Sequence, residues 1–359
     1  MGKSLMKGTE AIAEAAIQAG CKYFFGYPIT PQNEIPEYMS ARLPQVGGTY
    51  VQSESEVASI NMVMGGASTG HRVMTTSSSP GISLMSEGIS YIAMAELPCV
   101  IVNVSRGGPG LGNILPAQGD YNQATRGGGH GDYRMIVLTP GNLQEAVDLT
   151  QDAFDLSQKY RIPVMVLADG FMGQMMEAVE ILPRKAEDPA TNADWALGWW
   201  KERGGKSVTV KNIYLGPDIL EAHDTHLTEK YELIKANETR FEHYMADDAE
   251  LLLTSYGTTS RVCRSAVNNL RKDGYKVGMM RPITAWPFPT EGLSKLSESV
   301  KAVLDVEMSS TFQMSDDVRL ALASDIPVFT TGRWGGFSPT VRHVEEKCKE
   351  MLKGLAAHK

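Results

Sequence analysis

The sequence is poor in cysteine, and no two of its cysteines lie close together. Cys21, Cys99, Cys263 and Cys348 are the four in 359 residues, and no CxxC pair occurs. Because a zinc site or an iron–sulfur cluster needs closely spaced thiolates, we predict no metal ligands on this chain. Isolated cysteines are typical of proteins in a reducing compartment, so the sequence favours a cytoplasmic location.

The sequence also lacks an excess of basic charge and any long apolar run. Acidic residues number 42 against 34 basic ones, which gives a net charge of -8. Because nucleic-acid binding needs basic patches, no nucleic-acid partner is expected. No segment approaches the roughly 18 apolar residues of a membrane helix, and residues 1–16 lack the apolar core of a signal peptide. We therefore expect no membrane partner.

The first half of the chain alternates between helical and strand patterns. A chain of 359 residues is long enough for two domains. Helices are predicted over 8–19, 33–42, 53–70, 82–94 and 142–160, and strands over 22–26, 71–76, 98–104, 134–138 and 163–168. Such alternation predicts an α/β fold with a parallel, doubly wound sheet that helices cover on both faces.

The composition changes after position 182. Residues 183–246 carry prolines, glycines and charges with no clear period at first, and then a helical pattern over 223–245. A second α/β pattern begins near residue 247. The sequence therefore predicts a first domain over 1–182, a connecting region over 183–246 and a second domain over 247–359.

Candidate ligand-binding residues lie in turns that follow the predicted strands. In a doubly wound sheet these turns face one crevice, where ligands bind. Three such turns are predicted, at 27–31, 75–81 and 105–112. Thr30 offers a hydroxyl and Arg106 a cation, a combination that suits a small carboxylate or keto acid. The alternatives are that Arg106 pairs with a surface acid and that Thr30 satisfies its own turn.

An acidic turn opens the predicted helix over 53–70. Ser53 and Glu56 have the spacing of a capping box, in which each side chain satisfies a backbone N–H at the helix start. Negative charge there also complements the helix dipole. The alternative is that the Glu56 carboxylate contacts a cofactor. A loop over 107–131 holds nine glycines, and a structureless loop of that length is usually functional.

Taken together, these motifs resemble a known family. The segments YPITP (27–31), QSESE (52–56) and SPG (79–81), followed by Arg106, resemble the pyrimidine-binding domain of 2-oxoacid:ferredoxin oxidoreductases. The second α/β unit resembles the transketolase C-terminal-like domain that follows it in that family. The resemblance covers nearly the whole chain and implies a thiamine-diphosphate-binding fold. RGGPGLGNI (106–114) and QGDYN (118–122) are most similar to the alpha-type subunit of the enzymes for the branched-chain 2-oxoacid 3-methyl-2-oxobutanoate. The 2-oxoglutarate enzymes are the alternative.

The resemblance implies that one glutamate binds N1′ of the aminopyrimidine and favours its imino tautomer. Glu54 and Glu56 both compete for this catalytic role. In the family a glycine lies nine residues after the glutamate and another some five or six residues beyond it. Counting from Glu56 gives Gly65 and Gly70, whereas counting from Glu54 gives neither glycine. We therefore predict Glu56.

The other site residues are also carried over by resemblance. Ser79, Pro80 and Gly81 match the positions that line the pyrimidine pocket. Thr30 and Arg106 match those that bind the substrate carboxylate or keto group. For the substrate side chain, the apolar candidates are Ile29, Ile82, Met85 and Leu111, and the candidate cations for a distal carboxylate are Arg126 and Arg134.

One expected motif of a complete thiamine enzyme is missing. Such enzymes bind diphosphate and Mg²⁺ through a Gly-Asp-Gly segment, which this sequence does not contain. The resemblance therefore implies a thiamine diphosphate shared with a diphosphate-binding partner subunit that holds Mg²⁺. It also implies gamma-type and ferredoxin-type subunits, with [4Fe-4S] clusters on partners.

The whole enzyme would oxidise a 2-oxoacid with CoA to an acyl-CoA and CO₂, and pass electrons to ferredoxin. Two alternatives remain: a non-catalytic scaffolding subunit of such a complex, and a self-contained thiamine decarboxylase or synthase.

Overall fold

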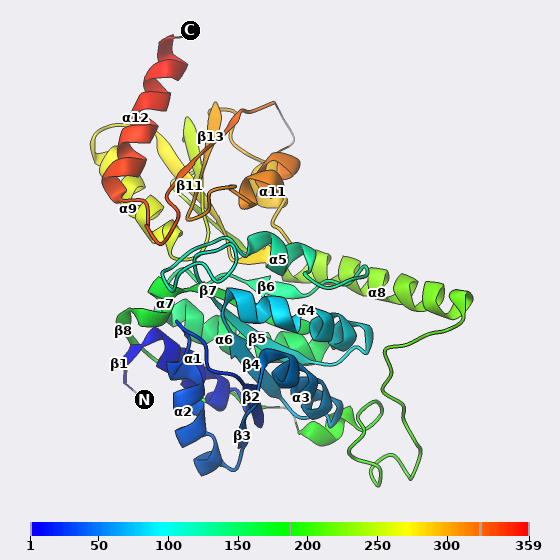
Figure 1. Ribbon diagram of the computed structural model, residues 1–359. Coiled ribbons are helices and arrows are strands. Elements are labelled where there is room, and N and C mark those ends of the chain that lie inside the picture. The colour runs from blue at the N-terminus through cyan, green and yellow to red at the C-terminus, as the bar shows by residue number, and fades with distance from the viewer. Residues whose placement is uncertain (1, 187, 323–324, 358–359) are drawn as a thin grey trace.

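The protein consists of two α/β units, seen one above the other in Figure 1. The structure is a computed structural model that describes residues 2–186, 188–322 and 325–357. The larger unit is built on a seven-stranded sheet. Its strands, in spatial order, are β12 (Thr284–Trp286), β6 (Ile136–Leu138), β7 (Pro163–Asp169), β5 (Cys99–Ser105), β4 (Val73–Ser77), β2 (Tyr23–Gly26) and β3 (Thr49–Gln52).

All neighbouring pairs in this sheet are parallel except β12 with β6. The prediction of a parallel, doubly wound α/β sheet is therefore confirmed for the first half of the chain. Strands β5 and β7 are buried along their whole length, as expected when helices cover both faces. A two-stranded antiparallel sheet, β1 (Ser4–Lys7) with β8 (Met176–Val179), lies beside this unit.

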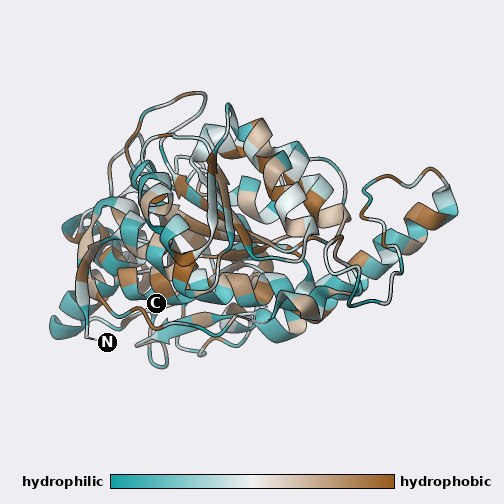
Figure 2. Cartoon of the chain, turned by 90° about the horizontal axis from the view of Figure 1, so that it is seen from below, coloured by the Kyte–Doolittle hydropathy of each residue, from teal (hydrophilic) through white to brown (hydrophobic). Residues whose placement is uncertain are grey.

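Helices flank both faces of the large sheet. One group packs together through α1 (Gly8–Gln18), which contacts α2 (Glu34–Arg42) and α6 (Leu143–Tyr160). On the other side α3 (Glu56–Ser68) packs on α4 (Ser79–Met94). Figure 2 shows the result, with brown apolar strands inside and teal on the outer helix faces.

The second unit has a five-stranded sheet. Its order is β14 (Val328–Gly332), β13 (Ala302–Glu307), β10 (Leu251–Thr254), β11 (Val277–Pro282) and β9 (Phe241–Tyr244). Helix α9 (Thr259–Lys272) packs on α12 (Val341–Ala357), and α11 (Met314–Ala321) contacts β13 and β14. The chain crosses between the units, since β12 follows β11 in sequence and joins the larger sheet. The division at 182 and 246 stays a prediction.

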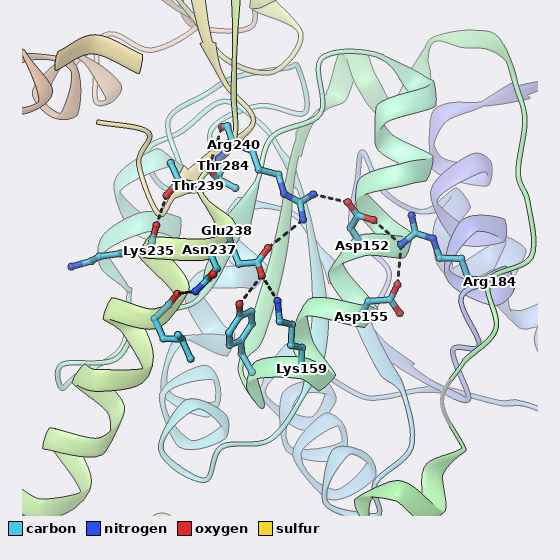
Figure 3. Close-up of polar contacts among 12 residues, drawn as sticks. Asp152, Asp155, Lys159, Arg184, Lys235, Asn237, Glu238, Thr239, Arg240 and Thr284 are labelled. Carbon is cyan, nitrogen blue, oxygen red and sulfur yellow. Dashed lines mark hydrogen bonds and ion pairs between the residues drawn. The ribbon is translucent and has the colours of Figure 1, made fainter. Parts of the chain in front are cut away.

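The connecting region ends in a helix that both begins and ends earlier than predicted. Helix α8 spans Pro217–Glu238 and is followed by strand β9, so the prediction of one helix through residue 245 is wrong at its end. The buried Glu238 accepts hydrogen bonds from Lys159 Nζ at 2.7 Å and Tyr160 Oη at 2.6 Å. Arg240 Nη1 donates to Asp152 at 2.6 Å (Figure 3). These contacts anchor both sides of the helix end on α6 and direct the chain into β9.

Two further features bear on the sequence predictions. A short helix, α5 (Tyr121–Arg126), interrupts the loop over 107–131, which the sequence analysis had treated as structureless. In Figure 1 it lies at the junction between the two units. No helix in the described ranges is both long and apolar enough to cross a membrane.

Candidate active site

Three parallel strands of the larger sheet end side by side. Strands β2, β4 and β5 are neighbours, and their carboxyl ends lead into the turns at 27–31, 78–81 and 106–112. The Arg106 Nη1 donates to the Thr30 carbonyl at 2.9 Å, and the Arg106 N–H donates to Ser79 Oγ at 3.0 Å. The structure therefore brings together all three turns that the sequence placed at one crevice.

Glu56 is the first residue of α3 and is 5% exposed. The cap of this helix is Ser55, whose hydroxyl accepts a hydrogen bond from the Ala58 N–H at 3.2 Å. The predicted capping box of Ser53 with Glu56 is therefore wrong. Ser53 is instead buried, with its Oγ 2.5 Å from Ser59 Oγ. The reason is that Ser55, directly before the helix, has the extended backbone that a cap requires.

The Glu56 carboxylate lies against Gly81 at the start of α4. A Cβ placed on Gly81 would lie 2.6 Å from Glu56 Oε1 and 2.0 Å from Ser77 Oγ. Among the described residues the Glu56 side chain makes no hydrogen bond, and the buried Ser77 hydroxyl beside it has no partner. An unpaired buried hydroxyl such as that of Ser77 is uncommon in native proteins and is consistent with a ligand site. By contrast, Glu54 is exposed.

Arg106 spans the crevice and is 8% exposed. Its Nη1 and Nη2 are occupied by the carbonyls of Thr30 and Leu111, at 2.9 and 3.1 Å. Its buried Nε has no acceptor among the described residues. The Thr30 hydroxyl accepts from Asn33 Nδ2 at 3.3 Å, a long contact that leaves its own proton free. The buried guanidinium Nε–H and the Thr30 hydroxyl proton thus remain for a ligand.

Ser79 is part of a polar network that the sequence analysis missed. Its hydroxyl donates to Asp120 Oδ2 at 2.6 Å, and Asn103 Nδ2 donates to the same oxygen at 2.9 Å. Asn103 Oδ1 in turn accepts from the Ser79 N–H at 3.2 Å. A signal for Asn103 existed, because it is the one amide in the strand CVIVNVS, which is apolar apart from this residue and the final serine. Nothing in the sequence links Asp120 to Ser79.

The candidates for a substrate side-chain pocket are scattered. Ile82 and Met85 are buried in the core, whereas Leu111 is 79% exposed. Arg126 donates to both carboxylate oxygens of Asp317. No three His, Cys, Asp or Glu side chains gather as a metal site would need, in the part of the chain that the structure describes.

The arrangement fits one half of a thiamine diphosphate site. An aminopyrimidine needs a carboxylate acceptor at N1′ and close backbone on its flank, and the crevice offers Glu56 and Gly81 for these purposes. A family model described as "Pyruvate flavodoxin/ferredoxin oxidoreductase, thiamine diP-bdg" matches residues 14–246. Another, "Pyruvate:ferredoxin oxidoreductase core domain II", matches residues 249–344. The chain belongs to the 2-oxoacid:ferredoxin oxidoreductase family.

Relatives within the 2-oxoacid:ferredoxin oxidoreductase family match most of this chain. The ketoisovalerate oxidoreductase subunits VorB of Methanothermobacter marburgensis and M. thermautotrophicus are each 48% identical over 98% of this chain and 98% of the relative. The 2-oxoglutarate synthase subunit KorA of Methanocaldococcus jannaschii is 39% identical over 87% of this chain and 90% of the relative. The predicted resemblance is confirmed, including its branched-chain and 2-oxoglutarate branches.

Solved structures agree with the thiamine-diphosphate-binding fold of this family. The 2-oxoglutarate:ferredoxin oxidoreductase from Magnetococcus marinus, solved with 2-oxoglutarate, coenzyme A and succinyl-CoA bound, superposes with a TM-score of 0.86 at 28% identity. The match covers 97% of this chain and 65% of that longer chain. A split-gene transketolase superposes with a TM-score of 0.59 at 13% identity, which is a likeness of fold alone.

Proposed function

We propose that this chain carries the pyrimidine half of the active site in a CoA-dependent 2-oxoacid:ferredoxin oxidoreductase that acts on 3-methyl-2-oxobutanoate. The observation that carries the proposal is Glu56, which is 5% exposed and whose carboxylate lies against Gly81 with no hydrogen bond to any described residue. Membership of the family supplies the reaction class. The products are an acyl-CoA and CO₂, and the electrons go to ferredoxin.

Each residue has one task in this proposal. Thiamine diphosphate supplies the carbanion chemistry that lets a 2-oxoacid lose its carboxylate. Glu56 holds the pyrimidine N1′ by a hydrogen bond and thereby controls the proton on the 4′-nitrogen. Gly81 and its neighbours Ser79 and Pro80 form the wall beside the ring. The Arg106 Nε and the Thr30 hydroxyl bind the carboxylate and keto oxygens of the substrate.

Partner subunits complete the site. The sequence has no Gly-Asp-Gly segment, so a second subunit provides the diphosphate and Mg²⁺ half. Val57, Leu84 and Leu111 expose apolar surface near Glu56, Gly81 and Arg106, as a surface that awaits a partner would. The gamma-type and ferredoxin-type subunits and the [4Fe-4S] clusters belong to the rest of the complex. We place the complex in the cytoplasm, where thiols such as the four buried cysteines of this chain stay reduced.

Two observations favour the branched-chain substrate over 2-oxoglutarate. Identity is higher to the VorB subunits, at 48%, than to KorA of Methanocaldococcus jannaschii, at 39%. A distal carboxylate also needs a second cation. Of the two candidates, Arg126 already binds Asp317 through both terminal nitrogens. The other candidate is Arg134, whose Nη1 donates to the Tyr133 carbonyl. The second candidate remains 2-oxoglutarate, because KorA subunits match most of the chain.

A substrate comparison on the assembled complex tests the proposal. The complex is purified without oxygen and assayed for CoA-dependent reduction of benzyl viologen with 3-methyl-2-oxobutanoate, 2-oxoglutarate, pyruvate and indolepyruvate. We expect the highest kcat/KM for 3-methyl-2-oxobutanoate. A higher value for 2-oxoglutarate would establish the second candidate, and no activity with any of the four would refute both.

A matched pair of variants tests the role of Glu56. We expect Glu56→Gln to lower kcat by about 10²–10⁴-fold, because the amide does not accept the pyrimidine proton as a carboxylate does. Glu54→Gln is the control, since Glu54 is exposed two residues away. Near-normal turnover of Glu56→Gln would point to a scaffolding subunit. Tight binding of thiamine diphosphate and Mg²⁺ by the lone chain would point to a self-contained thiamine enzyme.

A further inference from the structure

One residue of the glycine-rich loop over 107–131 is bound to the second α/β unit through both its side chain and its backbone. Gln118 is 3% exposed and its side-chain Nε2 donates to the Tyr256 carbonyl at 2.8 Å. Its Oε1 accepts from Thr259 Oγ1 at 2.8 Å and from the Met308 N–H at 2.9 Å. Its backbone N–H donates to the Met308 carbonyl at 2.9 Å, and its carbonyl accepts from Tyr256 Oη at 3.0 Å. All five bonds are made to the second unit.

The next two residues carry this attachment to the site. The Gly119 carbonyl accepts from Gln313 Nε2 at 2.8 Å, again from the second unit. Asp120 then turns toward the larger sheet, where its Oδ2 receives the Ser79 hydroxyl at 2.6 Å and Asn103 Nδ2 at 2.9 Å. Ser79 is the first residue of α4, two positions before Gly81. Three consecutive loop residues therefore connect the second unit to the wall of the crevice.

We propose that Gln118 and Asp120 are positioning residues through which the second α/β unit sets the start of α4. The proposal rests on the proposed function, because the start of α4 is the wall beside the pyrimidine there. Asp120 supplies the acceptor that fixes the Ser79 hydroxyl, and Ser79 Oγ in turn receives the Arg106 N–H at 3.0 Å. Through Ser79, the Asp120 carboxylate thus fixes both the start of α4 near Gly81 and the end of β5 next to Arg106.

The geometry explains why a unit outside the crevice is needed. Residues 108–116, which precede Gln118, are exposed or half-buried and include three glycines, so they give Asp120 little support from that side. Attachment through Gln118 fixes the position of the backbone that carries Asp120. A displacement of about 1 Å at a catalytic wall is enough to slow a reaction strongly.

The test uses the assembled complex with four variants in this chain. Asp120→Ala removes the acceptor, and Asp120→Asn keeps an oxygen acceptor of the same size. Tyr256→Phe removes one bond to Gln118 from the second unit without changing the ring. Glu145→Ala is the matched control, because it breaks a different contact between the units, that of Glu145 with Arg281 at 2.8 and 3.0 Å.

Two measurements are made on each variant. Hydrogen–deuterium exchange of residues 79–83 reports the start of α4 in the complex without substrate. Steady-state kinetics report kcat and the KM values for thiamine diphosphate and the 2-oxoacid. For Asp120→Ala we expect exchange and both KM values to rise about tenfold, the equivalent of one or two lost hydrogen bonds. Asp120→Asn should restore them to within about threefold, and Tyr256→Phe should raise exchange by about two- to fivefold.

The control decides between positioning and general loosening. Glu145→Ala should lower the thermal midpoint and leave both the exchange of residues 79–83 and the KM values unchanged. Wild-type exchange and KM in Asp120→Ala, or an equal rise in Glu145→Ala, would overturn the proposal. If the wild-type complex oxidises no 2-oxoacid, the proposed function fails, while the exchange data still decide whether Asp120 holds α4.

Discussion

At the scale of single residues, the site depends on a close approach that only glycine permits. Gly81 has no side chain, so the helix start can lie against the Glu56 carboxylate and the Ser77 hydroxyl. The Glu56 carboxylate has no hydrogen-bond donor among the described residues, so it is available to a ligand. Gly65 in α3 is the opposite case, since a Cβ there would meet nothing within 4 Å.

Alanine at these two glycines should have opposite effects. We expect Gly81→Ala to cost about 1–3 kcal/mol in unfolding free energy, because a Cβ 2.0 Å from Ser77 Oγ forces the helix start away. Turnover should fall at least tenfold. Gly65→Ala should add about 0.5–1 kcal/mol and leave turnover unchanged. Urea unfolding and viologen reduction measure both, and a neutral Gly81→Ala would contradict the close contact.

At the scale of elements, helix starts place the site residues. Helix α3 presents Glu56 from its first position, and the cap at Ser55 decides where that position lies. Helix α4 begins with SPG, with proline in its first turn, where a missing N–H costs nothing. The sequence pattern predicted SPG as a turn before a helix over 82–94, and this helix start was wrong by about one turn.

Removal of the α3 cap should weaken this element measurably. We expect Ser55→Ala to lower the unfolding free energy by about 1 kcal/mol, because the Ala58 N–H loses its acceptor. Ser55→Asp should retain most of the stability, since aspartate caps equally well. The measurement is urea unfolding of the full chain. An unaffected Ser55→Ala would show that Ser53, as first predicted, caps the helix in solution.

At the scale of the whole molecule, a buried acid pair makes the stability depend on pH. Asp305 and Glu307 on β13 are both 0% exposed. Asp305 Oδ1 accepts from Thr254 Oγ1 at 2.8 Å, and Glu307 Oε1 accepts from the Met314 N–H at 3.0 Å. Their other oxygens find no donor among the described residues, so a proton shared between the two carboxyls satisfies both. Burial raises the pKa of Asp305 to about 6 and that of Glu307 well above its usual value.

The sign of the pH effect follows from proton binding. Between about pH 4 and 6 the folded state keeps protons on this pair that the unfolded state releases, so the pair's contribution to the unfolding free energy falls as pH rises. Asp305→Asn keeps an acceptor for Thr254 and offers Glu307 an N–H. We expect the variant to gain on the order of 1–3 kcal/mol over wild type at pH 8, with little difference at pH 4. An equal difference at both pH values, measured by urea unfolding, would contradict the shared proton.

The sequence by itself determined the local pattern and the order of motifs. Alternating apolar runs predicted the parallel sheet because strand and helix periods depend on near neighbours. The glycine spacing that distinguished Glu56 from Glu54 is likewise local, although it needed a family resemblance to have meaning. The catalytic and binding roles of Glu56, Thr30 and Arg106 stay predictions.

The tertiary structure alone decided what joins distant parts of the chain. The return of β12 to the larger sheet, the end of α8 at Glu238 and the bond from Ser79 to Asp120 all join groups from 41 to about 150 residues apart, or depend on such contacts. The hydrophobic periodicity of the sequence does not predict such a pairing, because the choice of partner depends on the competition of all surfaces for burial and hydrogen bonds. For that reason the residues of the crevice could be named from the sequence, whereas the residues that hold them in place could not.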